Sequence, residues 1–198
     1  MTRPGPQDPA LRIPSRMNTN LLTKGGRETV SVHACKLMVW NIQEAGSSKT
    51  INILKEHIRL HMPSIVAIIK THIYRTRAQT VCDKIGFGGN FRVEARGFQG
   101  GIWIFCKLED VEVDIIHAHE HYVTMEIKQR RHLKWVCTVV YASPHVQMRE
   151  ILWAELQQFA SQCTHLWLIA GDFNETINLK ERNHGGPDML TRCTRFKH

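Results

Sequence analysis

The sequence predicts an α+β domain in which two β-sheets pack face to face with helices on the outside. Strand-like segments outnumber helical ones, and many of them follow each other without an intervening helix. A doubly wound parallel sheet fits less well, because no glycine fingerprint follows the first strand. The 198 residues suit one domain of ordinary size with its own core.

Residues 1–34 differ in composition from the rest and are expected to form a disordered, basic N-terminal arm. They hold four prolines, the pair Gly25–Gly26 and no sustained hydrophobic period. An excess of Arg over acids is also typical of organelle transit peptides, but the prolines disfavour an amphipathic helix. The domain itself is expected to span residues 35–198.

The first half of the domain alternates between strands and helices. Ser47 and Ser48 can cap a helix with the apolar period Ile51, Leu54 and Ile58, which Met62–Pro63 ends. A second helix is predicted for 75–85, with Val81 and Ile85 facing inward. Strands are predicted for 36–41, 64–73, 90–96 and, after a turn at Gly97, Gly100 and Gly101, for 102–107. The continuously apolar 64–73 strand is expected to be covered on both faces.

The second half consists mainly of strands. Residues 111–129 alternate in polarity over a length that predicts a two-stranded hairpin. Residues 133–144 and 165–174 are predicted to be buried strands. The helix between them, residues 149–160, has an expected period of Ile151, Leu152, Glu155, Leu156 and Phe159. After Thr176 the sequence becomes polar and irregular.

Polar side chains stand where three apolar strands end. The first strand ends at Asn41, the 133–144 strand carries Tyr141, and the last strand carries Asp172 and Asn174. Strand ends on a rigid sandwich hold functional groups in place while remaining open to solvent. Asp172 and Asn174, two residues apart, could bind Mg²⁺ and orient a water or a phosphate oxygen. The alternative is an Asx turn that only closes the strand.

Five segments in order, LMVWN, GGIWIFCK, VVYASP, AGDFNE and HGG, resemble the endonuclease domain of plant non-LTR (LINE-type) retrotransposons. The resemblance covers about residues 36–198, and RCTRFKH at the end is similar to the stretch before that domain's final third. This domain belongs to the endonuclease/exonuclease/phosphatase superfamily. The resemblance implies a DNase I-like, four-layer αββα sandwich that is incomplete at its C-terminal end.

The resemblance also implies roles for the strand-end residues in Mg²⁺-dependent phosphodiester hydrolysis. Asn41 matches an Asn near the metal, and Tyr141 matches a Tyr that contacts the scissile phosphate. Asp172 matches the Asp that orients or deprotonates the attacking water. Asn174 matches an Asn that contacts the phosphate and stabilises its developing charge.

Two departures from the family pattern predict a degenerate site. The metal-binding Glu that ends the family's second strand is replaced by Lys70, which repels a cation but could bind substrate phosphate. The C-terminal Ser-Asp-His motif is expected to be missing as well, which would leave an open sheet edge and exposed core. Losing one member of a catalytic unit usually removes most of the rate.

The composition limits the expected binding partners and the expected cellular compartment of the protein. A formal net charge of +8 favours a polyanion such as DNA, although a basic surface can also serve only solubility. No membrane span, secretory signal or small-molecule cofactor is expected. The six cysteines form no Cys-x-x-Cys pair, which favours reduced core residues in an intracellular protein over a zinc or disulfide framework. A functional DNA nuclease would act in the nucleus.

Two further segments have open interpretations. His117, His119 and His121 would share one face of an unbroken strand, where they could bind zinc or form a solvated face. The basic turn at 128–134 could contact phosphate or remain a solvated loop.

The sequence therefore predicts a retrotransposon-derived domain whose ancestral reaction is Mg²⁺-dependent DNA nicking and whose own site is degenerate. One alternative is a non-enzymatic remnant that binds nucleic acid. The other is a phosphatase of small or lipid phosphates.

Overall fold

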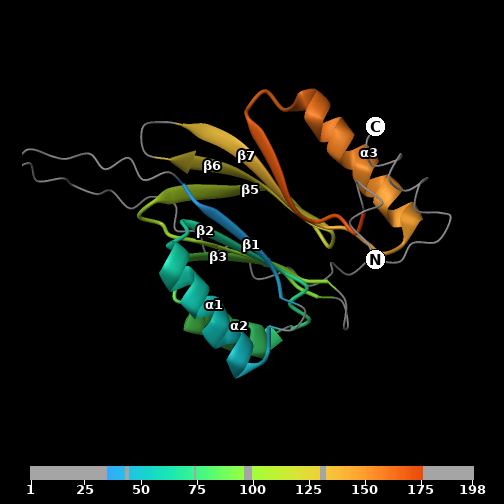
Figure 1. The fold of residues 1–198 in the computed structure, drawn as a ribbon. Coiled ribbons are helices and arrows are strands. Elements are labelled where there is room, and N and C mark those ends of the chain that lie inside the picture. The colour runs from blue at the N-terminus through green and yellow to red at the C-terminus, as the bar shows by residue number, and fades with distance from the viewer. Residues whose placement is uncertain (1–34, 43–44, 74, 96–99, 130–132, 176–198) are drawn as a thin grey trace, which may run out of the picture.

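The computed structural model describes residues 35–42, 45–73, 75–95, 100–129 and 133–175 and arranges them as two β-sheets packed face to face (Figure 1). Helices α1 (Ser48–His61) and α2 (Arg75–Ile85) cover the outer face of the first sheet. Helix α3 (Val146–Gln162) lies over the outer face of the second sheet. The predicted α+β sandwich is confirmed, while the predictions for the N-terminal arm and for residues 176–198 lie outside the described residues.

The first sheet has the strand order β1-β2-β4-β3. Its strands are β1 (Leu37–Asn41), β2 (Ile65–Ile69), β3 (Gly89–Val93) and β4 (Ile102–Cys106). Every residue of β2 and β4 is buried, which explains why both segments are apolar without alternation. Strands β1 and β2 run parallel, so both end at the same edge of the sheet.

The second sheet has the order β5-β6-β7-β8. Its strands are β5 (Val111–His119), β6 (Tyr122–Gln129), β7 (Lys134–Tyr141) and β8 (Trp167–Asp172). Strands β5 and β6 form the predicted antiparallel hairpin. Helix α3 returns the chain so that β8 runs parallel to β7, and these two strands also end side by side.

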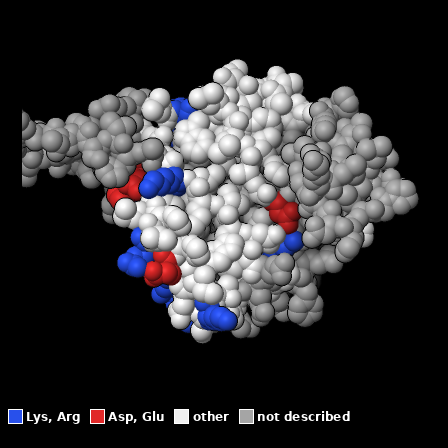
Figure 2. Space-filling view, viewed as in Figure 1, with Lys and Arg blue, Asp and Glu red and all other residues white. Residues whose placement is uncertain are grey.

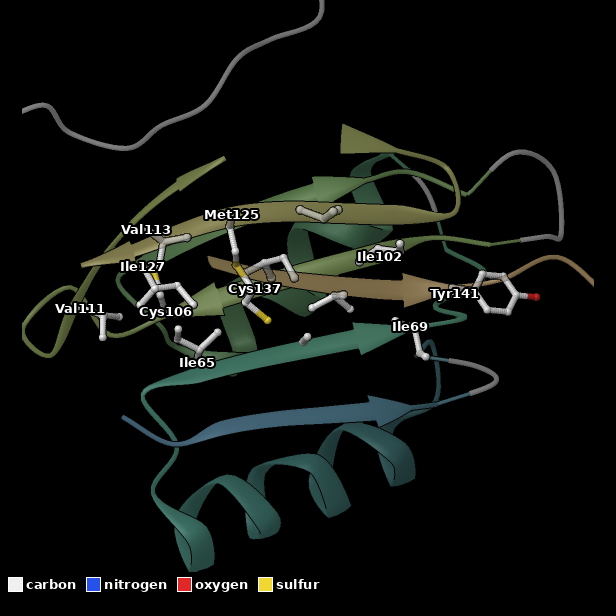
Figure 3. Close-up of a cluster of buried hydrophobic side chains, with 14 residues drawn as sticks. Ile65, Ile69, Ile102, Cys106, Val111, Val113, Met125, Ile127, Cys137 and Tyr141 are labelled. Carbon is white, nitrogen blue, oxygen red and sulfur yellow. The ribbon is translucent and has the colours of Figure 1, made fainter. Parts of the chain in front are cut away.

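The main core lies between the two sheets, where inward-facing side chains of both interdigitate (Figure 3). Tyr141 stands at one end of this cluster, with its hydroxyl pointing away from the other side chains (Figure 3). Cys106 and Cys137 belong to the cluster, and Cys82 is buried under the first sheet, as expected for cysteines used as small core residues. Burial raises the pKa of Cys106 to about 11 and that of Cys137 to about 12.

Helix α1 begins and ends where the sequence predicts. The Ser47 hydroxyl accepts a hydrogen bond from the backbone N–H of Thr50 at 3.0 Å. Met62 takes a left-handed conformation that ends the helix, and its N–H donates to the Ile58 carbonyl. Ile51 and Leu54 are buried against the first sheet, as predicted.

The structure corrects two predictions in the second half. Ile151 was expected to face inward but is 53% exposed, whereas Arg149, Leu152 and Leu156 form the buried face of α3. The 165–174 strand was expected to be buried, but Leu168 is 44% exposed. Among the described strands, β8 pairs only with β7 and is the last strand in the order of its sheet.

No helix in the described ranges is long and apolar enough to cross a membrane.

Candidate functional site

The predicted site residues meet where four strands end at one edge of the sandwich. Asn41 ends β1, Lys70 follows β2, Tyr141 ends β7 and Asp172 ends β8. Asn41 Nδ2 donates a hydrogen bond to Asp172 Oδ2 at 2.8 Å, which joins the two sheets. The parallel pairs β1/β2 and β7/β8 explain the convergence, because parallel strands deliver their carboxyl ends to the same edge.

The carboxylate of Asp172 accepts hydrogen bonds from three donors. Lys70 Nζ donates to Oδ2 at 3.0 Å, alongside Asn41 Nδ2. The backbone N–H of Asn174 donates to Oδ1 at 3.0 Å. A carboxylate offers about four lone-pair positions, so three of them are already occupied by protein donors.

Lys70 lies between the carboxylate of Asp172 and the aromatic ring of Tyr141. Its ion pair with Asp172 is partly shielded, since the two side chains are 20% and 22% exposed. Its Nζ also lies 5.1 Å from the ring centroid of Tyr141, within the range of a cation–π contact. The backbone of Lys70 has φ +60°, a left-handed conformation that costs a non-glycine residue energy.

Asn174 takes part in a turn, and its side chain also contacts the segment that follows β7. The hydrogen bond from its N–H to Asp172 Oδ1 is an Asx turn, and its φ is +48°. Its Nδ2 donates to the Ala142 carbonyl at 2.6 Å. Asp172 therefore does both: its Oδ1 closes the Asx turn, and its Oδ2 accepts hydrogen bonds from Asn41 and Lys70.

Gly171 is the residue that allows β8 to deliver Asp172 to this edge. Its φ is +146°, and a Cβ at this position would lie 1.9 Å from the Val140 carbonyl oxygen of β7. Only glycine permits this close approach of the two strand backbones.

The residues of the cluster do not fit a divalent cation such as Mg²⁺. Magnesium needs oxygen ligands in octahedral geometry, and the one carboxylate of the cluster faces an ammonium and an amide N–H₂ at Oδ2. In the described part of the chain no three His, Cys, Asp or Glu side chains gather in a way that could hold a metal. The ammonium of Lys70 lies against Asp172 Oδ2, where a cation would have to bind.

Arg149 of α3 contacts the segments that follow Tyr141 and Asp172, and it was not among the predicted site residues. Its Nε donates to Glu175 Oε1 at 2.8 Å, and its Nη1 donates to the carbonyls of Ser143 and Pro144 at 2.9 and 2.7 Å. It thus ties α3 to the loops that follow Tyr141 and Asp172. The spacing of Arg149, Leu152 and Leu156 on one helix face could have revealed it.

The three histidines do not share one strand face. Strand β5 ends at His119, and the chain turns before β6 begins. The His117 ring contacts Phe159 of α3, while the His119 and His121 rings lie 5.6 Å apart at the turn. His121 Nδ1 lies 3.1 Å from the Tyr141 carbonyl oxygen, so this histidine borders the cluster.

Basic side chains of the predicted 128–134 turn are paired with acids where they are described. Lys128 Nζ contacts Asp114 at 2.5 Å and Glu112 at 3.2 Å, and these hydrogen bonds hold its pKa above the ordinary value. Lys134 lies 3.7 Å from Glu126. On the face shown in Figure 2, described basic and acidic side chains are scattered and form no continuous basic stripe.

The fold matches solved structures of nucleases and phosphatases at low sequence identity. The endonuclease domain of TRAS1, a telomere-specific non-LTR retrotransposon, has a TM-score of 0.57 at 11% identity, over 83% of this chain and 70% of that one. D. rerio TDP2 complexed with a single-strand DNA product has a TM-score of 0.53 at 13% identity, over 72% and 61%. The mannosyl-6-phosphatase Bt3783 of Bacteroides thetaiotaomicron has 0.52 at 11%, over 79% and 70%.

The chain spans less than two thirds of the length of the TDP2 structure. No protein-family model and no curated protein matches the sequence. Identities this low carry the fold and not the activity. These structures share the two packed sheets and outer helices of this chain. The chain therefore has the DNase I-like fold of the endonuclease/exonuclease/phosphatase proteins.

Proposed function

We propose that this chain is a retrotransposon-derived DNase I-like domain that binds DNA and in which the ancestral, Mg²⁺-dependent nicking reaction is lost or strongly reduced. The contact of Lys70 Nζ with Asp172 Oδ2 at 3.0 Å carries the proposal. It places an ammonium against the side chain that the family resemblance assigns to the attacking water.

The remaining strand-end residues support a phosphate ester as the ligand class. Asn41, Tyr141 and Asn174 lie within one cluster at the open end of a rigid sandwich, where a phosphodiester backbone can approach. The surplus of eight positive charges adds a long-range attraction for DNA. The solved relatives of this fold include a DNA complex and a retrotransposon nuclease, which supports DNA over a small phosphate.

Hydrolysis requires a base that accepts a proton from water, and Asp172 is poorly placed for this. Three protein donors already occupy its oxygens, so little acceptor capacity remains to orient a water molecule. DNA binding without nicking is the expected behaviour.

The test combines plasmid nicking with DNA binding. Purified protein is incubated with supercoiled plasmid in Mg²⁺ or in EDTA, beside Asp172→Ala, and binding to labelled DNA is followed by anisotropy over a range of salt. We expect binding that weakens steeply with salt and no nicking above the EDTA control. Nicking that needs both Mg²⁺ and Asp172 would show a working endonuclease, and absence of DNA binding by folded protein would refute the DNA assignment.

A further inference from the structure

The donors around Asp172 form the kind of site that binds an oxyanion. Lys70 supplies an ammonium, Asn41 a side-chain amide and Asn174 a backbone N–H, all between 2.8 and 3.0 Å from a carboxylate oxygen. They come from three separate segments of the chain. A charged donor combined with neutral N–H groups is the usual environment of a bound phosphate or sulfate in proteins.

The carboxylate of Asp172 thus occupies a place that a phosphate oxygen pair could take. Lys70 and Asp172 are each about one-fifth exposed, so a ligand from solvent can reach them. Lys70 Nζ is further oriented by the Tyr141 ring at 5.1 Å. The local charge of the pair is close to zero, which gives an approaching anion little net attraction.

We propose that Asp172 acts as an internal anion that fills an oxyanion site, and that this site takes up a phosphate or sulfate group without a divalent cation when substitution removes the carboxylate. The inference rests on the proposed function in taking a phosphate as the ligand class. It makes Lys70 the principal anion-binding group and Asp172 its intramolecular competitor.

Tethering explains why the internal carboxylate prevails over free phosphate. A group held in the same fold competes at an effective concentration of about millimolar or higher. Removing it leaves one uncompensated ammonium and two directed N–H donors at a partly shielded position. Phosphate affinity should therefore rise when Asp172 is changed, the reverse of what loss of an ordinary binding residue does.

The test is calorimetric titration with inorganic phosphate, in EDTA and at constant ionic strength, with melting temperatures followed in parallel. Asp172→Ala is compared with the wild-type protein and with Asp83→Ala, which removes an exposed carboxylate from α2 and changes the net charge equally. We expect at least about tenfold tighter phosphate binding for Asp172→Ala only, a difference of 1.4 kcal/mol. Adding Lys70→Met to Asp172→Ala should abolish the gain.

Equal phosphate affinity in wild type and folded Asp172→Ala would overturn the inference, as would a gain that survives Lys70→Met or that Asp83→Ala reproduces. If Asp172→Ala does not fold, Asp172→Asn retains the shape of the side chain and replaces it in every comparison. The titration contains neither DNA nor metal, so its outcome is separate from success or failure of the nicking and DNA-binding test.

Discussion

Lys70 and Asp172 carry opposite charges, and Lys70 Nζ lies 3.0 Å from Asp172 Oδ2, in the cluster where the family resemblance predicts a metal-binding Glu at position 70. The ammonium offsets the charge of Asp172 and links the sheet of β2 to the sheet of β8. A point charge on a flexible stem cannot lower the pKa of a bound water as a metal does. Under the proposed function, Lys70 keeps the two sheets in contact at the site but does not supply what a metal would supply to hydrolysis.

Gly171 is predicted to be irreplaceable for a reason independent of catalysis. Gly171→Ala would place a methyl group 1.9 Å from the Val140 carbonyl oxygen, so β7 and β8 must separate. We expect a loss of about 3 kcal/mol or more in the free energy of unfolding, measured by urea denaturation.

Gly86→Ala is the matched control for this substitution. Gly86 also has a positive φ, +78°, but no atom lies within 4 Å of the added Cβ, so only the left-handed backbone cost of about 1–2 kcal/mol applies. Equal losses for the two variants would contradict the clash with β7.

Helix α3 is held to the site by a buried charge pair. The side chains of Arg149 and Glu175 are only 1% and 8% exposed, and the guanidinium also serves two carbonyls of the loop after β7. The segments that follow Tyr141 and Asp172 are therefore both bound to the Arg149 guanidinium. A buried charge that loses its partner is costly.

Glu175→Ala is expected to lower the free energy of unfolding by about 3–5 kcal/mol, because it leaves the Arg149 guanidinium buried and uncompensated. Arg149→Met combined with Glu175→Met should be markedly less destabilised than Glu175→Ala alone. Urea unfolding of the variants measures both values.

The Arg59–Glu56 pair on α1 provides the comparison. Glu56→Gln also removes an Arg–Glu ion pair, but this pair is exposed to solvent. Its unfolding midpoint should not change. A Glu175→Ala protein as stable as Glu56→Gln would show that the buried pair contributes nothing.

The sequence predicted most elements and their ends, because apolar runs, the Ser47 cap and Met62–Pro63 are local signals. It also predicted the cluster of Asn41, Tyr141 and Asp172. It failed for Ile151 and for Leu168, whose exposure depends on what packs against α3 and β8 rather than on local pattern. The pairing of Lys70 with Asp172 joins residues 102 positions apart and requires a left-handed backbone, which no local pattern specifies.

The core as a whole uses thiols at several buried positions, which makes its stability sensitive to alkaline pH. Burial raises the pKa of Cys82 and Cys106 to about 11 and that of Cys137 to about 12, whereas a thiol in the unfolded chain has a pKa of about 8.5. Above that pH the unfolded chain loses protons that the folded chain keeps, so stability must fall as pH rises.

We therefore expect the urea midpoint to decrease between about pH 8.5 and pH 10, and to decrease less in Cys137→Val. A midpoint that stays constant or rises over this range would contradict the burial of these thiols in the folded protein.

The binding of Mg²⁺ by Lys70→Glu, compared with wild type, tests the central claim that the Lys70 ammonium stands where the family resemblance predicts a metal-binding Glu. Glutamate in the left-handed backbone of residue 70 changes the charge without relieving the strain, and Lys70→Met controls for loss of the ammonium alone.

Calorimetric titration with Mg²⁺, with melting temperatures in parallel, is the decisive measurement. We predict no binding for wild type and Lys70→Met. For Lys70→Glu we predict that Mg²⁺ binds. At a free Mg²⁺ concentration ten times the dissociation constant, binding should raise the free energy of unfolding by about 1.4 kcal/mol and the melting temperature by roughly 3–6 °C. Mg²⁺ binding by the wild-type protein as tight as by Lys70→Glu would contradict the account.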